Sequence, residues 1–166
     1  MSGLLEARRL SVARRGQPIL HDVSIGFPST GAVAVIGPNG AGKSTLLALL
    51  AGLEKPATGE VRLGTRPVAD VPAAELAQSI GFMPQHFEPH WDLALEELLG
   101  MRLTPPRGRA AGALPTVDEV IARSGLDAFR SRRWSTLSGG EQARVLLATV
   151  LATDPPILLA DEPGAA

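Results

Sequence analysis

A run of glycines followed by a lysine and two hydroxyl residues has the composition of a phosphate-binding loop. Its residues are Gly37, Pro38, Asn39, Gly40, Ala41, Gly42, Lys43, Ser44 and Thr45, which fit the spacing G-x-x-x-x-G-K-[ST]. Glycines let the backbone wrap closely and turn successive N–H groups inward, and a following helix adds the positive end of its dipole. Lys43 would then reach the β- and γ-phosphates of a nucleoside triphosphate, and the Ser44 hydroxyl would bind magnesium.

The residues on either side provide the setting that this motif requires. Ala32–Ile36 is an apolar run of β type, and Leu46–Leu50 is a leucine-rich run of helical type. A strand, the loop and a helix in this order are the context of a P-loop. The alternative is a glycine-rich turn that merely starts a helix, and the Lys-Ser pair placed after a strand disfavours it.

A second glycine pair lies about a hundred residues further on, in Leu137–Gln142, just before a helical pattern. Ser138 and Glu141 fit a capping box, which helix stability alone would explain. The capping box does not explain Gly139 and Gly140. Each glycine costs about 0.5–1 kcal/mol relative to alanine in a helix, so a cap selected only for stability would avoid the pair. Two glycines keep the N–H groups accessible, and with the Ser138 hydroxyl and the helix dipole they predict a second phosphate site.

Two acids follow a short apolar run near the end of the chain. Asp161 and Glu162 come directly after Ile157–Ala160, which is typical of a buried strand. Successive side chains of a strand point in opposite directions, so the two carboxylates suit two separate roles. The alternative is a strand that surfaces with two solvated acids.

Composition restricts the class of protein. The 166 residues suit one domain, and 16 basic against 17 acidic residues give no global field for a nucleic acid partner. Cysteine is absent, which excludes disulfides and thiolate metal sites. The apolar runs are far shorter than the roughly 20 residues that a membrane span needs, so a membrane role requires a partner protein.

Strands alternating with helices around the P-loop predict an α/β fold. We expect an antiparallel β region over Leu4–Phe27, and a loop over Thr104–Pro115. Thr116 and Glu119 predict a capping box at the start of a helix. The other expected elements are a hairpin carrying Glu60–Leu63, helices over Pro72–Gln78, Leu93–Met101, Thr116–Ser124 and Glu141–Leu151, and strands over Ser79–Met83 and Ile157–Ala160.

The P-loop and Leu137–Gln142, in this order, resemble the P-loop and signature motif of ABC-type ATPases, over nearly the whole chain. The resemblance implies a P-loop NTPase (RecA-like) core with an N-terminal antiparallel β region and a helical subdomain. It divides residues 1–166 into a β region and P-loop core (1–85), a helical subdomain with the signature (86–145) and the region of the acid pair (146–166). It also implies a head-to-tail dimer in which Ser138, Gly139, Gly140 and Gln142 of one domain close on the γ-phosphate held by the other.

The same resemblance implies ATP and Mg²⁺ as cofactors. Asp161 would hold magnesium through its water shell, and Glu162 would orient and deprotonate the attacking water. Gln85 matches the family's glutamine loop, which senses the γ-phosphate and magnesium, although a lone loop glutamine is usually a solvated side chain. His86 and His90 have a metal-compatible spacing, but Pro89 and the lack of a third ligand disfavour a metal site.

The chain departs from the family pattern in two places. Arg14 stands where members carry an aromatic residue that stacks on adenine; its guanidinium can also stack on a base, and weaker or less selective adenine binding is the open alternative. The family's later strand and switch histidine have no counterpart, since the three histidines all precede Trp91. We therefore expect a fragment that lacks C-terminal strands, leaves two core strands with unpaired edges and hydrolyses ATP poorly by itself.

Pro84–His86, Leu95–Leu99 and the acid pair resemble ATPases of bacterial importers for iron–siderophore, haem or cobalamin complexes. This implies transmembrane permease subunits and a substrate-binding protein as partners, at the cytoplasmic face of the bacterial inner membrane. Two alternatives stay open: a soluble ABC ATPase not linked to transport, and a non-catalytic nucleotide-binding module. A P-loop kinase or GTPase is disfavoured because neither needs Leu137–Gln142.

Overall fold

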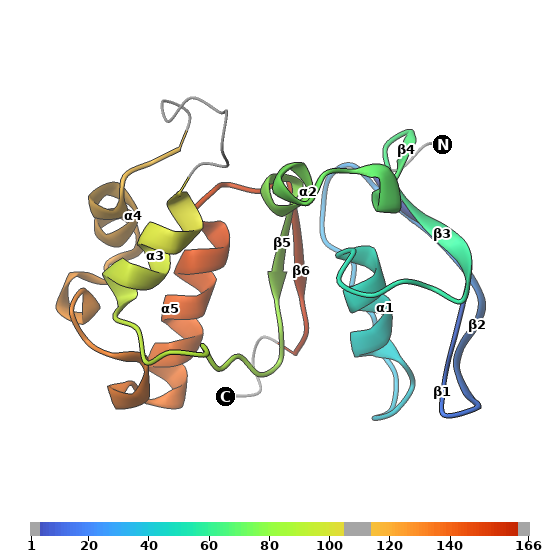
Figure 1. Cartoon of the computed structure of the whole chain (residues 1–166), viewed down its shortest axis with the longest axis horizontal. Coiled ribbons are helices and arrows are strands. Elements are labelled where there is room, and N and C mark those ends of the chain that lie inside the picture. Colours follow the sequence, from blue (N-terminus) through green and yellow to red (C-terminus); the bar gives the residue numbers. More distant parts are fainter. Residues whose placement is uncertain (1–3, 105–113, 163–166) are drawn as a thin grey trace. The chain divides into compact units, whose positions relative to one another are not determined.

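The computed structural model describes residues 4–104 and 114–162 of the chain. It divides into two compact units, Met1–Ala77 and Gln78–Ala166, and each is described here by itself (Figure 1). The division falls within helix α2 (Ala73–Ser79), close to the helix expected over Pro72–Gln78. Among the described residues, no helix combines the length and apolar character needed to cross a bilayer.

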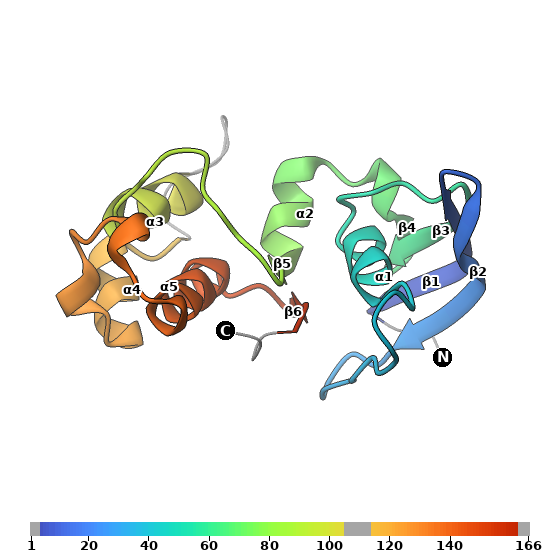
Figure 2. The same cartoon turned by 90° about the horizontal axis from the view of Figure 1, so that it is seen from below.

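The first unit is an antiparallel sheet with one helix beside it (Figure 2). Its strands are β1 (Leu5–Arg14), β2 (Gln17–Phe27), β3 (Thr58–Leu63) and β4 (Arg66–Pro67), in the order β2-β1-β3-β4. The expected β region and hairpin are therefore confirmed. Arg15 and Gly16 turn β1 into β2, both with positive φ (50° and 77°), as a two-residue hairpin requires.

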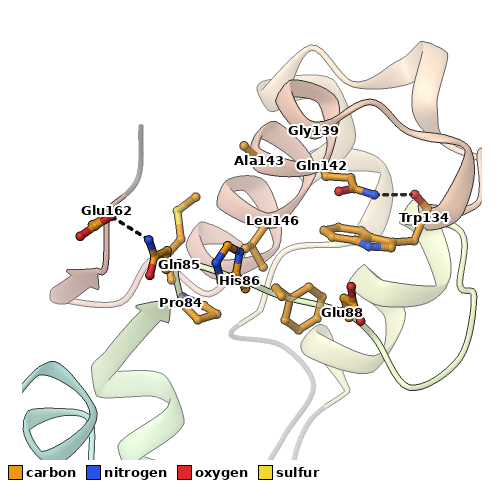
Figure 3. Close-up of a pocket in the computed structure, with 12 residues that line it drawn as sticks. Pro84, Gln85, His86, Glu88, Trp134, Gly139, Gln142, Ala143, Leu146 and Glu162 are labelled. Carbon is orange, nitrogen blue, oxygen red and sulfur yellow. Dashed lines mark hydrogen bonds between the residues drawn. The ribbon is translucent and has the colours of Figure 1, made fainter. Parts of the chain in front are cut away.

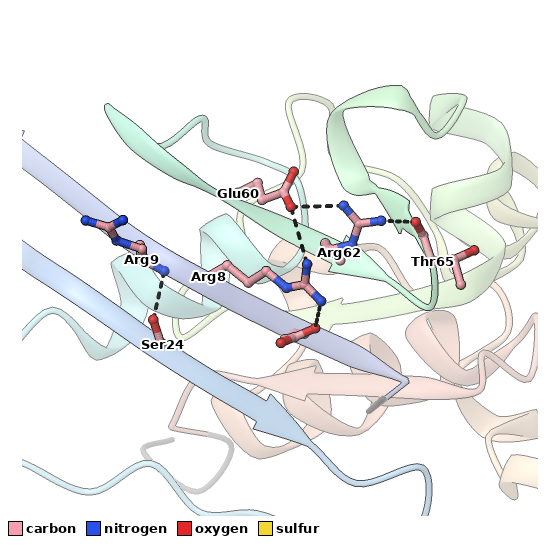
Figure 4. Close-up of polar contacts among 7 residues, drawn as sticks. Arg8, Arg9, Ser24, Glu60, Arg62 and Thr65 are labelled. Carbon is pink, nitrogen blue, oxygen red and sulfur yellow. Dashed lines mark hydrogen bonds and ion pairs between the residues drawn. The ribbon is translucent and has the colours of Figure 1, made fainter. Parts of the chain in front are cut away.

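One face of this sheet is apolar and the other carries a ladder of charges (Figure 4). Ala7 pairs with Val61 across β1 and β3, and both side chains are buried. The alternate residues carry charge, with Glu6 paired to Arg62 and Arg8 paired to Glu60. Within the strands Arg8 lies 2.7 Å from Glu6 and Arg62 lies 2.9 Å from Glu60, and across the strands Arg8 lies 3.9 Å from Glu60.

The predicted strand Ala32–Ile36, which leads into the P-loop, is not formed. The segment has no strand partner among the described residues, and Val33 and Ile36 are 51 % and 90 % exposed. An extended run is held only by ladder bonds to a neighbour, so apolar composition alone does not make a strand. Helix α1 (Lys43–Leu50) follows the loop as expected, with Leu49 and Leu50 buried.

The second unit pairs two parallel strands with a group of helices. Strand β5 (Ile80–Met83) runs beside β6 (Ile157–Ala160), with Met83 opposite Ala160. Strand β6 was expected to be buried, but only Leu159 is, and Leu158 is 44 % exposed. The reason is that β6 pairs only with β5 among the described residues, so part of its surface remains uncovered.

Three α-helices form the core of this unit: α3 (Leu95–Leu103), α4 (Val117–Ser124) and α5 (Gly139–Leu151). The buried residues at their centre include Leu99, Val120, Ile121 and Val145. Short 3₁₀ turns lie at Asp127–Phe129 and Trp134–Thr136, and most of the loop expected over Thr104–Pro115 lies outside the described residues.

The capping box of α4 is formed as the sequence predicts. The Thr116 hydroxyl accepts from the Glu119 N–H at 3.2 Å, and the Glu119 carboxylate accepts from the Thr116 N–H at 2.7 Å. These bonds hold the pKa of the Glu119 carboxyl below its usual value, chiefly through the backbone N–H.

Candidate functional site

Gly42 sets the geometry of the P-loop at the start of α1. It is the N-cap residue in the left-handed conformation, with φ of 86°, and its carbonyl accepts the Leu46 N–H at 2.8 Å. A Cβ added there would lie 2.9 Å from Leu20 Cδ2 and 3.0 Å from the Ile19 carbonyl oxygen. Only glycine satisfies both conditions, so the strand β2 side chains and the loop conformation together require it.

Lys43 folds back over the carbonyl groups of the loop. Its Nζ donates to the carbonyl oxygens of Gly37 and Pro38, at 3.0 and 3.1 Å, and the Ala41 N–H also donates to Pro38 at 3.2 Å. Gly37, Pro38, Asn39, Gly40, Ala41 and Ser44 are exposed, whereas Thr45 is buried against the unit's core. The ammonium group is thus held by the loop's own carbonyl oxygens, within a loop whose residues are mostly exposed.

Arg14, at the end of β1, is held by an acid from the segment after α1. Its Nη2 lies 2.5 Å from Glu54 Oε1, and both side chains are partly exposed. The guanidinium therefore has a charge-assisted hydrogen bond to Glu54.

The parallel register of the second unit brings Gln85 to Glu162. Met83 and Ala160 are opposite each other, so the residues that follow them leave the same edge of the strand pair. The Gln85 Nε2 donates to Glu162 Oε2 at 2.7 Å, across 77 positions of sequence. Glu162 itself has φ of 49°, an uncommon conformation for a residue with a side chain.

Asp161 is buried and continues the strand pairing, whereas the neighbouring Glu162 is exposed. Its N–H donates to the Met83 carbonyl at 2.9 Å, which continues the β5–β6 ladder by one residue. The residue is only 6 % exposed, whereas Glu162 is exposed. The two acids therefore differ in environment, but both lie beyond the end of β6 and Glu162 has positive φ, so the alternation expected along a strand is not what separates them.

A cavity of about 320 Å³ separates this strand edge from helix α5 (Figure 3). Gln85 and Glu162 line one side, and Gly139 and Gln142 line the other. The remaining lining residues are Met83, Pro84, His86, Phe87, Glu88, Trp134, Ala143 and Leu146. The Phe87 and Trp134 rings meet edge to face, with centroids 5.2 Å apart.

The first turn of α5 contains the glycine pair. Ser138 is the N-cap residue, and the helix begins at Gly139, two residues before the predicted start. A Cβ added to Gly139 or Gly140 would meet no atom within 4 Å. Neither has positive φ, so nothing in the described part of the chain requires a glycine at these two positions.

Glu141 and Gln142 tie this turn to the segment before it. The Glu141 carboxylate accepts the Ser138 N–H at 2.7 Å and the Ser138 hydroxyl at 2.9 Å. Arg132 Nη1 donates to the same carboxylate at 2.7 Å. The Ser138 N–H, then Arg132, lower the pKa of Glu141 to about 2. The Gln142 amide donates to the Trp134 carbonyl at 3.1 Å.

Of the expected site residues, the structure joins Gln85 with Glu162, and it places Gly139 and Gln142 around the same cavity. The P-loop belongs to the first unit and is described separately. Arg132 was not foreseen as a site residue, because its contact with Glu141 depends on how the intervening turn folds. The arginine itself was visible in the sequence, but no motif spacing pointed to it.

Comparison with known proteins places these features in a family. The model of the family described as "ABC transporter" matches residues 20–165. The hemin import ATP-binding protein HmuV of Rhodopseudomonas palustris is 40% identical over 98% of this chain and 64% of its own length. The protein of the same name from Streptomyces coelicolor is 44% identical over 98% of this chain and 59% of its own length. This chain therefore spans about six tenths of the length of these curated relatives.

Solved structures of ABC transporter ATPases share the fold of this chain. An ATP-binding subunit of an ABC transporter has a TM-score of 0.77 at 27% identity, over 98% of this chain and 67% of that one. A dimeric ATP-binding cassette in a post-hydrolysis state with ADP and Pi also has a TM-score of 0.77, at 29% identity, over 98% and 75%. A putative metal-chelate type ABC transporter shares the fold at 24% identity, with a TM-score of 0.74, over 100% and 62%. The chain belongs to the ABC transporter family.

Proposed function

We propose that this chain is the nucleotide-binding part of an ATPase subunit that powers an ABC importer of iron complexes. It binds ATP with Mg²⁺ and works as a head-to-tail pair with a second ATPase domain. Gly139 and Gly140 carry the proposal, because a side chain would fit there and would stabilise the helix, yet the chain has none. Something outside the described fold must need that space, and a helix start with bare N–H groups suits a phosphoryl group.

The P-loop is the other half of each composite site. Its nine residues, Gly37–Thr45, surround the phosphates of one ATP with backbone N–H groups, and Lys43 leaves the loop carbonyls to bind the terminal phosphates. The signature residues Ser138, Gly139, Gly140 and Gln142 of the paired domain cover the same terminal phosphate. Two anion sites of this kind in one chain, each incomplete by itself, favour a dimer over a monomer.

The donor atoms available suit Mg²⁺, which prefers hard oxygen ligands and keeps several waters. Asp161 offers a buried carboxylate, Gln85 an amide oxygen and Ser44 an exposed hydroxyl. These three residues would hold the ion, which when bound neutralises charge on the β- and γ-phosphates.

Glu162 is the general base of this proposal. Its carboxylate would accept the proton of a water that attacks the γ-phosphate. In the structure the Gln85 amide donates to Glu162, so Gln85 steadies the carboxylate before nucleotide arrives. Its amide oxygen would be a ligand for the ion when nucleotide is bound, and Gln85 would thereby link the state of the nucleotide to the segment that lines the cavity.

The cavity beside Gln85 supports a transmembrane permease as partner. Its walls combine Phe87, Ala143 and Leu146 with polar residues, and nearby Trp91 is 62 % exposed. An apolar surface of this kind suits a short segment of another protein. A permease partner would place the subunit at the cytoplasmic face of the bacterial inner membrane, together with a substrate-binding protein.

The cargo follows from the relatives rather than from this chain's own residues. Those relatives are named for hemin import, so we propose haem or a similar iron chelate. Loss of haem-dependent growth after deletion of the gene, restored by the wild-type gene and not by Lys43→Ala, would support it. Unchanged haem use, with a defect for another chelate, would reassign the cargo and leave the ATPase proposal intact.

The ATPase proposal is tested on the full-length gene product with two variants. Lys43→Ala removes the ammonium group from the P-loop, so ATP binding measured by calorimetry falls by about a hundredfold or more, since charge-assisted contacts to phosphate are strong. Glu162→Gln keeps ATP binding but stops turnover, so ATP-bound dimers accumulate in size-exclusion chromatography. Wild-type protein that binds ATP without hydrolysis, with its permease present, would instead select the non-catalytic module.

A further inference from the structure

The first turn of α5 carries a negative charge where the proposed function needs an anion to approach. Glu141 lies one residue beyond Gly140, and its carboxylate reaches back to Ser138. An uncompensated carboxylate beside a phosphoryl group would repel it. The inference below rests on the proposed function, because it concerns the residue that removes this conflict.

Arg132 supplies the compensating charge. Its Nη1 lies 2.7 Å from Glu141 Oε1, and its Nη2 lies 3.4 Å from Glu141 Oε2, so both carboxylate oxygens face the guanidinium. The Nη2 also donates to the Thr136 carbonyl at 2.6 Å, and the Phe129 ring lies under the guanidinium at 5.4 Å. Three separate contacts therefore fix the orientation of one arginine.

Glu141, held in this way, in turn fixes Ser138. Its Oε2 accepts both the backbone N–H and the hydroxyl of that residue. The hydroxyl proton therefore has a defined resting acceptor. When a phosphoryl oxygen arrives, the hydroxyl can turn its proton to the phosphate while the N–H stays on Glu141. The carboxylate is ionised throughout, since the pKa of Glu141 is far below neutrality.

We infer that Arg132 is a positioning residue of the signature phosphate site. It cancels the charge of Glu141 and holds that carboxylate against Ser138, so that the terminal phosphate of ATP meets a neutral, preorganised helix start. Arg132 does not touch the phosphate and acts only through Glu141. The pair thereby makes the capping of α5 compatible with binding an anion at the same turn.

The competing explanation is a purely structural brace, in which Arg132 only stabilises the turn before α5. The two explanations differ in their dependence on charge. A brace holds the turn through the same ion pair, which salt also screens, so the loss in Arg132→Gln would not be recovered when Glu141 is neutralised as well. Repulsion between Glu141 and phosphate is screened by salt and disappears when Glu141 is neutral.

The experiment measures ATP-driven dimerisation of the full-length gene product in the hydrolysis-deficient Glu162→Gln background. The variants are Arg132→Gln, Glu141→Gln and the two combined. Arg123→Gln is the matched control, because Arg123 donates to the carbonyls of Leu151 and Ala152 at the other end of the same helix. Thermal unfolding of each variant checks that it is folded.

At about 0.05 M salt, Arg132→Gln should weaken ATP-driven dimerisation by about tenfold, and at about 0.5 M salt the loss should shrink to about threefold or less. Adding Glu141→Gln should restore dimerisation to within about threefold of the parent at low salt, because the repelling charge is gone. Arg123→Gln should stay within about twofold at both salt concentrations.

A loss in Arg132→Gln that persists or deepens when Glu141→Gln is added would overturn the inference in favour of the brace, and a loss that is independent of salt would overturn it too. An unchanged Arg132→Gln would overturn it as well. Failure of the proposed function looks different: in that case the Glu162→Gln parent does not dimerise with ATP at all.

Discussion

Alanine at Gly139 or Gly140 should make the protein more stable and less active. Both residues lie in the first turn of α5, both have ordinary φ, and an added methyl group would meet no atom within 4 Å. Glycine in a helix costs about 0.5–1 kcal/mol relative to alanine, and a position at the helix end gives the lower part of that range. For a protein of this size a gain of about 0.5 kcal/mol corresponds to a rise in Tm of about 1–2 °C.

The ATPase activity of the Gly139→Ala and Gly140→Ala variants should fall while their stability rises. The methyl group occupies the surface through which the paired domain's terminal phosphate approaches, so we expect ATP turnover to fall by about tenfold or more, as when a preorganised donor is displaced. The assay pairs thermal unfolding with steady-state phosphate release, both on the full-length gene product.

The matched control is Gly100→Ala in helix α3 of the same unit. Gly100 also has ordinary φ, and a Cβ there meets nothing within 4 Å. It should gain similar stability with unchanged turnover. If Gly139→Ala and Gly140→Ala were as active as Gly100→Ala, the two glycines would have no role in binding phosphate, and the reasoning would be refuted.

Three further changes test the local structure. Gly42→Ala should destabilise the protein by more than about 1 kcal/mol, because the left-handed N-cap and the contact with Leu20 exclude a methyl group. Unfolding in urea measures this loss, and an unchanged urea midpoint would contradict the expectation. Thr116→Ala should cost about 1 kcal/mol through loss of the α4 cap, again by urea unfolding, and a cost near zero would show that the cap is redundant. Glu141 has its folded pKa lowered to about 2 from the ordinary value of 4.5, so its contribution is present above pH 4.5 and is lost as pH falls towards 2. Glu141→Gln should therefore flatten the acid loss of stability in that window, and an unaltered acid titration would refute the assignment.

Local signals accounted for much of the fold. The spacing of Thr116 and Glu119 predicted the capping box, and the glycine and lysine positions of the P-loop predicted the start of α1. Both features depend on residues only a few positions apart. The antiparallel region before the P-loop could also be predicted from the sequence, since its hairpin turn is local.

Features that depend on contacts between residues far apart in the sequence were harder to predict. Ala32–Ile36 has the composition of a strand, but a strand exists only when another pairs with it. The burial of β6 was overestimated for the same reason. The meeting of Gln85 with Glu162 follows from the parallel register of β5 and β6, and the contact of Arg132 with Glu141 follows from a turn whose path no motif encodes.

The central claim is that each ATP lies between the P-loop of one domain and the signature of another. It is tested most directly by mixing two variants in the Glu162→Gln background, one with Lys43→Ala and one with Gly140→Asp. Each alone should fail to form ATP-bound dimers. Mixed together they should form heterodimers with one ATP each, because one of the two composite sites is then intact. If the mixture stayed monomeric while both variants remained folded and the parent dimerised, a site shared between two domains would be ruled out.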